Sequence, residues 1–166
     1  MSTDAIVLLK QDHKEVRRLF RAFEKADEDD TQNKAHLVEQ MLELLTVHTY
    51  IENEAVYPRT RELLPDLEED VLESYEEHHV ADMLCLELEN LSPDHEHFAA
   101  KTTVLIENVE HHIEEEEEEW FPKVREGLGR KTLQEIGAHM LDLKKTAPRR
   151  PSDPRARESA AKAVEA

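Results

Sequence analysis

The chain of 166 residues is long enough for one domain with one hydrophobic core. Charged residues make up 36% of it and only 3 residues are glycine, a balance typical of a helical protein with a charged exterior. The net charge of -18 argues against nucleic acid and anionic membrane surfaces as partners, because their phosphates would repel the chain. The single cysteine, Cys85, excludes an intrachain disulfide. Neither a signal peptide nor a membrane span is recognisable, so we expect a cytoplasmic protein.

Apolar residues that recur every three or four positions predict four long helices. We expect the first to follow a cap at Ser2 or Thr3 and to end near Ala26, before a run of acidic residues. The second should run from about 33 to 64. Pro58 lies late in this segment and should kink or end the helix, because proline cannot donate a backbone hydrogen bond.

The second pair of helices is bounded by prolines and glycines. The third helix should span roughly 67–91. The fourth should begin at Pro93, with Ser92 as its cap, since proline fits the first position of a helix. It should end near Glu126, before two glycines, with Pro122 disturbing its last turns.

A short fifth helix is predicted near 131–144, where apolar residues again share one side. The composition changes after this point, because 147–166 holds prolines among charges and then many alanines. We expect this tail to be disordered. The predicted fold is therefore all-α. It is an up-down-up-down antiparallel four-helix bundle over 1–146 with a short C-terminal fifth helix and a disordered tail.

The strongest functional signal is a doubled motif of histidine and glutamate four positions apart, a spacing that places both on one helix face. Tyr57-Pro58 follows the first copy and Phe121-Pro122 the second, with the proline ten residues after the histidine in both. Another histidine precedes each copy by about one helical hairpin. In chain order the set is His13, His48, Glu52, His78, His112 and Glu116.

The predicted turns place the four histidines at one depth. In an up-down bundle, residues equally far from a turn lie at the same height on neighbouring helices. The midpoints between successive histidines fall in the turn at 29–31, near Pro65 and beside 92–94. Four imidazoles and two carboxylates buried together without partners would be strongly unfavourable. The layer therefore predicts a site for two metal ions.

Two of the histidines have neighbours that compete for the same role. The positions that follow His78 at helical spacing are apolar, whereas those that follow His79 include Asp82, so His78 is preferred. His112 is preferred to His111, because it shares a face with apolar residues and corresponds to the histidine of the first copy.

Imidazole and carboxylate ligands without thiolate suit iron or manganese and also admit zinc. In order, spacing and doubling, these motifs resemble the hemerythrin-like HHE cation-binding domain over roughly residues 1–145. The resemblance implies a four-helix bundle that holds two iron ions, with zinc or manganese less expected, and with an oxide or hydroxide completing the centre. It also implies the ligand roles: His13 and His48 for one iron, His78 and His112 for the other, and Glu52 and Glu116 as bridges.

The chain departs from oxygen-carrying hemerythrin on the third helix. Oxygen-carrying hemerythrin is expected to have the motif His-x-x-x-His on that helix, whereas the residue four positions after His78 is Asp82 in this chain. A missing imidazole leaves more room for water, peroxide, nitric oxide or dioxygen. Asp82, Tyr75, His79 and His111 stay open as further ligands.

Acidic residues next to the histidines are candidate supports for the ligands. Asp12 and Glu77 adjoin ligand histidines in sequence, but neighbours on a helix point about 100° apart. This geometry makes them weak candidates.

We expect a non-haem di-iron protein that reacts with peroxide, dioxygen or nitric oxide. If the protein is an enzyme, the expected reaction is the decomposition of peroxide. A reversible oxygen carrier, an iron store or a sensor is the main alternative, and a structural zinc-binding bundle is another. A reductase or other protein partner stays open. His36, His95, His97 and His139 lie outside the layer, and no role is expected for them.

Overall fold

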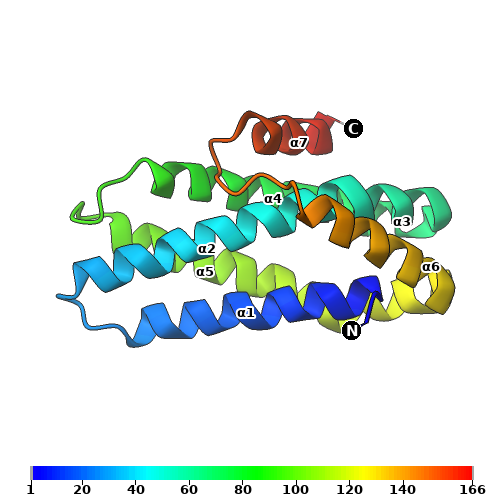
Figure 1. Ribbon diagram of the computed structural model, residues 1–166, viewed down its shortest axis with the longest axis horizontal. Helices are drawn as coiled ribbons and strands as arrows, with labels where there is room; N and C mark the ends of the chain where they lie inside the picture. The colour runs from blue at the N-terminus through cyan, green and yellow to red at the C-terminus, as the bar shows by residue number, and fades with distance from the viewer. Residues whose placement is uncertain (1, 166) are drawn as a thin grey trace.

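The computed structural model describes residues 2–165, whose regular elements are all helical, as predicted, with no strand among them. Four long helices lie side by side along their lengths (Figure 1), and neighbouring helices are in contact with one another. They are α1 (Ala5–Lys25), α2 (Thr31–Ile51), α4 (Glu68–Glu89) and α5 (Phe98–Glu115). The shorter or later elements are α3 (Tyr57–Leu63), α6 (Phe121–Lys144) and α7 (Pro154–Glu165).

Two helix starts differ from the prediction. Asp4, rather than Ser2 or Thr3, caps α1, because its Oδ1 accepts a hydrogen bond from the backbone N–H of Val7 at 3.1 Å. The α5 helix begins at Phe98 and not at Pro93. The residues between form two tight turns, closed by backbone bonds from 95 to 92 and from 98 to 95, so the chain reverses before the helix starts.

Each copy of the motif leads into one turn of π-helix, at Glu52–Val56 and at Glu116–Trp120. The N–H of Tyr57 bonds to the carbonyl of Glu52, and the N–H of Phe121 bonds to that of Glu116, five residues back in each case. A proline stands two residues after the end of each turn, Pro58 after the first and Pro122 after the second. The proline ring would crowd the carbonyl four residues earlier, and the wider turn relieves this conflict. The helix therefore continues through each proline instead of ending there.

The apolar core consists of two clusters, one towards each end of the long helices. Leu9 and Val71 belong to the first, and Phe20 and Met41 to the second. Along α1 and α4, His13 and His78 lie between residues of one cluster and residues of the other. In α2 His48 follows Val47 of the first cluster, and in α5 His112 precedes Ile113 of the second. The polar layer is thus sealed by apolar side chains on both sides.

The C-terminal segment folds back over the bundle. Helix α6 bends sharply at Gly129, whose φ of 72° suits glycine, and the predicted fifth helix is the part after this bend. It crosses the N-terminus so closely that a Cβ on Gly137 would lie 1.5 Å from the carbonyl oxygen of Thr3. In Figure 1, orange marks this returning segment.

The expectation of a disordered tail is wrong for most of its length, because Pro154–Glu165 form α7, which packs mainly on α4. The linker before it is held by Glu89, which accepts bonds from Arg150 Nε at 2.8 Å and Ser152 N at 2.9 Å. Small side chains make the contact face, namely Ser159, Ala160 and Ala163. Such a face carries almost no hydrophobic signal in a sequence. The domain boundary at 146 stays a prediction.

Among residues 2–165, no helix combines the length and the apolar character needed to cross a membrane.

Candidate metal centre

The structure brings all six predicted ligands together in the buried layer. Helices α1, α2, α4 and α5 each contribute one histidine, and the two π-turns each begin with one glutamate. The exposed fractions of the side chains are at most a few per cent: His13 1%, His48 6%, Glu52 0%, His78 2%, His112 7% and Glu116 2%. An interpretation of these residues as separate core histidines and surface acids does not fit this convergence.

The six residues form two groups of three that could each hold an ion. One group is His13, His48 and Glu116, the other is Glu52, His78 and His112, and within each the ligand atoms lie within 4.8 Å of one another. Each glutamate belongs to the group that does not contain the histidine of its own motif. Glu52 follows His48 in sequence but groups with His78 and His112, and Glu116 follows His112 but groups with His13 and His48.

Each glutamate faces histidines of both groups. Oε1 of Glu52 lies 2.7 Å from Nε2 of His48 and 3.5 Å from Nε2 of His78. The two oxygens of Glu116 divide in the same way. Oε2 lies 3.2 Å from Nε2 of His13, and Oε1 lies 3.4 Å from Nε2 of His112. Each carboxylate therefore lies between an imidazole of one group and an imidazole of the other.

The outward nitrogen of every histidine is hydrogen-bonded, which turns the other nitrogen towards the centre. Each Nδ1–H donates to a side-chain oxygen at 2.6–3.2 Å. Such bonds fix the tautomer and ring orientation of metal-ligating histidines. The four pairs are His13 with Glu117, His48 with Asp12, His78 with Asn53, and His112 with Glu77.

Asp12 and Glu77, weak candidates by sequence, are two of these acceptors. Neither bonds to the histidine next to it in sequence, in keeping with the angle between neighbours on a helix. Each instead reaches across to the histidine of an adjacent helix, Asp12 to His48 at 3.2 Å and Glu77 to His112 at 2.6 Å. Only the packing of the helices could reveal this.

Tyr57 reaches into the histidine layer, which the sequence analysis did not predict. Its hydroxyl donates to Oε1 of Glu116 at 2.8 Å and lies 3.1 Å from Nε2 of His78. Burial, together with the charges of Glu116 and Glu52, raises the pKa of this phenol well above its ordinary value. In the sequence, the one sign of a special position was that Tyr57 corresponds to Phe121 of the second copy and so adds a hydroxyl to an otherwise aromatic position.

In the metal-free protein, the imidazoles and carboxylates of the layer shift one another's pKa values. Burial lowers the pKa of His48, but the carboxylates of Glu52 and Asp12 outweigh it and raise the pKa to about 10. Burial likewise raises the pKa of Asp12, but the hydrogen bond to His48 outweighs it and lowers the pKa to about 2. Without a metal, imidazolium–carboxylate pairs therefore neutralise part of the layer.

Several inward atoms nevertheless make no hydrogen bond of suitable geometry, although some of them lie close to an imidazole or a carboxylate of the layer. They are Nε2 of His13, both carboxylate oxygens of Glu52, and Oε2 of Glu116. Buried polar atoms without a partner are costly, and a positive ion between them would satisfy all four. The nitrogen and oxygen donors, with no sulfur, fit a divalent metal such as iron, manganese or zinc.

The four residues left open as further ligands do not join either group. Asp82 accepts a hydrogen bond from Thr49 at 3.3 Å, and burial raises its pKa. His111 is 67% exposed and pairs with Glu115. Tyr75 packs edge-on against the ring of Tyr57, and His79 is half-buried.

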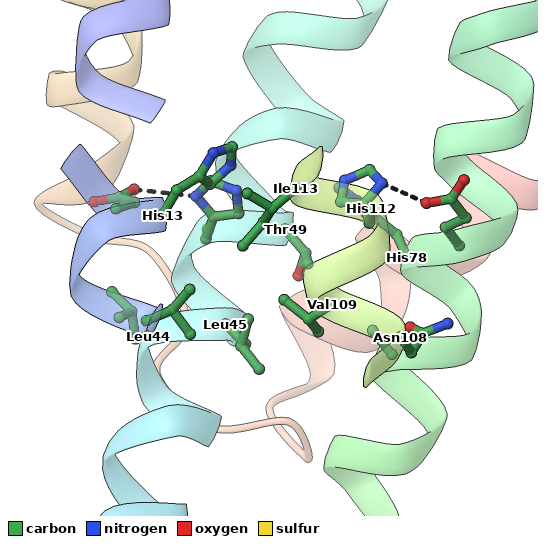
Figure 2. Close-up of a pocket in the computed structure, with 14 residues that line it drawn as sticks. His13, Leu44, Leu45, Thr49, His78, Asn108, Val109, His112 and Ile113 are labelled. Carbon is green, nitrogen blue, oxygen red and sulfur yellow. Dashed lines mark hydrogen bonds and ion pairs between the residues drawn. The ribbon is translucent and has the colours of Figure 1, made fainter. Parts of the chain in front are cut away.

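A small cavity of about 20 Å³ adjoins the histidine layer on the side of the second apolar cluster (Figure 2). All four histidines line it. The rest of its wall is largely apolar, with Val16, Leu44, Leu45, Ala81, Val109 and Ile113. Figure 2 shows His13 and the His78–His112 pair on opposite sides of this space.

A helical bundle with paired, buried histidine and carboxylate groups defines a class of metal-binding proteins. The comparison with known families agrees, since the model described as the hemerythrin HHE cation binding domain matches residues 4–124. The chain belongs to this family. It is also 28% identical over 121 residues to a DNA nickase of Nostoc sp. (strain PCC 7120 / SAG 25.82 / UTEX 2576). That match covers 73% of this chain but 33% of the nickase, so the chain spans about a third of this relative. No solved structure matches this chain.

Proposed function

We propose that the protein is a non-haem di-iron protein, an antiparallel four-helix bundle that reacts with or binds peroxide, dioxygen or nitric oxide. The observation that carries this proposal is the crossed arrangement of the two groups, in which Glu52 and Glu116 each face histidines of both. His13 and His48 would hold one iron, and His78 and His112 the other. Bound iron would supply the redox chemistry that such small oxidants require.

The residues of the chain hold the ligands in place and exclude water. The four Nδ1 bonds fix the imidazole rings, and the Tyr57 hydroxyl orients Glu116. Because Tyr57 is 0% exposed and its pKa is raised, its proton stays on the phenol and is available as a hydrogen-bond donor at the centre. The cavity gives a small molecule room beside the histidines.

Reversible binding of dioxygen or nitric oxide is the second candidate function. The apolar wall of the cavity favours it, because uncharged diatomic molecules enter apolar space readily while water and ions do not. A peroxide-consuming protein converts the molecule that it binds, whereas a carrier releases it unchanged. Iron storage or sensing would use the same residues.

The activity named for the nickase acts on DNA, and we propose that it does not carry over. The shared segment is about a third of that protein, and this chain has a net charge of -18. Phosphates would be repelled by such a surface. What the two proteins share is, in our proposal, the metal-binding domain.

Iron content and the visible spectrum before and after peroxide test the proposal. Protein purified without added metal should hold two irons per chain and should consume peroxide faster than the same concentration of an iron salt. A stable, reversible spectrum on exposure of the reduced protein to dioxygen would favour the carrier. Two zinc ions and no iron would overturn the di-iron proposal in favour of a structural zinc bundle.

A further inference from the structure

The two halves of the centre correspond residue by residue, so each half serves as a comparison for the other. The ligands are of the same type in both halves, and Asp12 corresponds to Glu77 as an acceptor of an Nδ1–H bond. The correspondence fails at two positions around the ligands. Asn53 stands where the second copy has Glu117, and Tyr57 stands where it has Phe121.

The first difference lies behind the histidine ligands. Glu117 follows Glu116 in its π-turn and accepts the Nδ1–H of His13 at 2.8 Å. Asn53 follows Glu52 in the other π-turn and accepts the Nδ1–H of His78 at 3.0 Å. Three of the four imidazoles thus donate to a carboxylate, and His78 alone donates to a neutral amide.

The second difference lies in front of the same histidine. The hydroxyl of Tyr57 is 3.1 Å from Nε2 of His78, the nitrogen that faces the centre. The corresponding contact in the other half is a stack of Phe121 on His13, with ring centroids 5.7 Å apart and an interplanar angle of 8°. A phenyl ring places no polar atom at Nε2 of His13, whereas the phenol places its oxygen beside Nε2 of His78, with its single proton donated to Glu116.

The first difference weakens His78 as a donor to a metal. A carboxylate that accepts the Nδ1–H bond makes an imidazole more basic and a better metal ligand, and such partners commonly change metal affinity by about 10–100-fold. A neutral amide oxygen polarises the ring less. A weaker donor also stabilises the lower-charged ferrous ion relative to the ferric ion.

We propose that the two metal positions are unequal by construction, with the ion at His78 and His112 held more weakly and kept ferrous more readily than the ion at His13 and His48. Asn53 is the positioning residue that sets much of this difference through His78. The proposal rests on the two-metal centre proposed above. It implies stepwise loading, with a half-loaded protein as a distinct species.

Titration of the metal-free protein with Co²⁺, followed by calorimetry and by the visible absorption of the bound ion, tests the proposal. The wild type should show two unequal binding steps. His78→Ala should remove the weaker step and His13→Ala the stronger one. Asn53→Asp keeps the shape of the side chain but adds the charge, and should tighten the weaker step about 10–100-fold. It should also lower the reduction potential of that iron in the iron-loaded protein.

Glu117→Gln is the reciprocal variant and should weaken the stronger step, while the neighbouring exposed Glu118→Gln should change neither. Two equal steps in the wild type would overturn the proposal. So would an Asn53→Asp protein that melts normally but keeps both wild-type affinities. If Asn53→Asp does not fold, Glu117→Gln alone decides. Because Co²⁺ affinities do not depend on peroxide chemistry, a protein with two unequal steps but no reactivity would contradict only the proposed function.

Discussion

The hydroxyl of Tyr57 donates to Oε1 of Glu116 at 2.8 Å, so a residue that follows the first copy of the motif binds the glutamate of the second. Both side chains are almost fully buried, at 0% and 2% exposure. This bond ties the two π-turns together across the bundle. Its loss should therefore be felt both in stability and at the metal.

Tyr57→Phe should lower the free energy of unfolding of the metal-free protein by roughly 1.5–3 kcal/mol, because a buried carboxylate loses its hydrogen-bond donor. It should also shift the visible spectrum of the iron-loaded protein. Tyr75→Phe is the matched control, since this neighbouring ring only packs edge-on against Tyr57. Chemical denaturation and absorption spectra measure the two effects. Equal behaviour of both variants would show that the Tyr57 hydroxyl has no role at the centre.

His112→Ala should lose at least one of the two metal ions and lower the melting temperature of the protein as purified, because metal binding contributes to folding stability. The adjacent His111→Ala should retain full metal content, since this side chain is 67% exposed. His48→Ala and Glu116→Ala should behave like His112→Ala. Elemental analysis with thermal melts, before and after a chelator, measures both. Full metal content in all three ligand variants would refute the ligand assignment.

Metal loading should release protons and should weaken as the pH falls. The pKa of His48 is raised to about 10 by Glu52 and Asp12 despite burial, so its imidazole is protonated at pH 7 in the metal-free protein. A metal must displace that proton. The raised pKa stabilises the metal-free fold fully below the ordinary value of 6.5, and this contribution disappears as the pH rises to about 10. Calorimetry in buffers of different ionisation enthalpy counts the released protons, and a buffer-independent heat would contradict the prediction.

Asp4→Ala should lower the free energy of unfolding by about 1 kcal/mol, because α1 loses its N-cap. Hydrogen bonds from Arg125 and from the backbone N–H of Val7 hold the pKa of Asp4 below its ordinary value of 3.8, against the effect of burial. A lowered folded pKa stabilises the protein above the unfolded value, and the contribution is lost as the pH falls through the folded value. The difference between wild type and variant should thus shrink below pH 3.8. Asp29→Ala, at an exposed turn position, should show no such difference.

Ala160→Asp should detach α7 from the bundle, because it places a charge on the buried face of this helix. Trypsin should then cleave rapidly at Arg155 and Arg157, while the metal content stays unchanged. Ala161→Asp adds the same charge at the adjacent exposed position and should leave the cleavage rate as in the wild type. If both variants are cleaved equally slowly, α7 is held by something other than its alanine face.

The sequence by itself determined the helical class, the positions of the long helices and the six inward groups, because apolar periodicity and the spacing of His48 and Glu52 are local properties of a helix. It could not place helix starts such as Phe98, where competing turns are close in energy, nor the docking of α7, whose alanine face carries almost no hydrophobic signal.

Only the tertiary structure decided how the groups act on one another. The exchange of Glu52 and Glu116 between the two groups depends on how separate helices pack. So does the reach of Asp12 to His48 and the hydrogen bond from Tyr57. These contacts join residues far apart in the chain, and helical periodicity fixes the face on which a residue lies but not the neighbour that it meets.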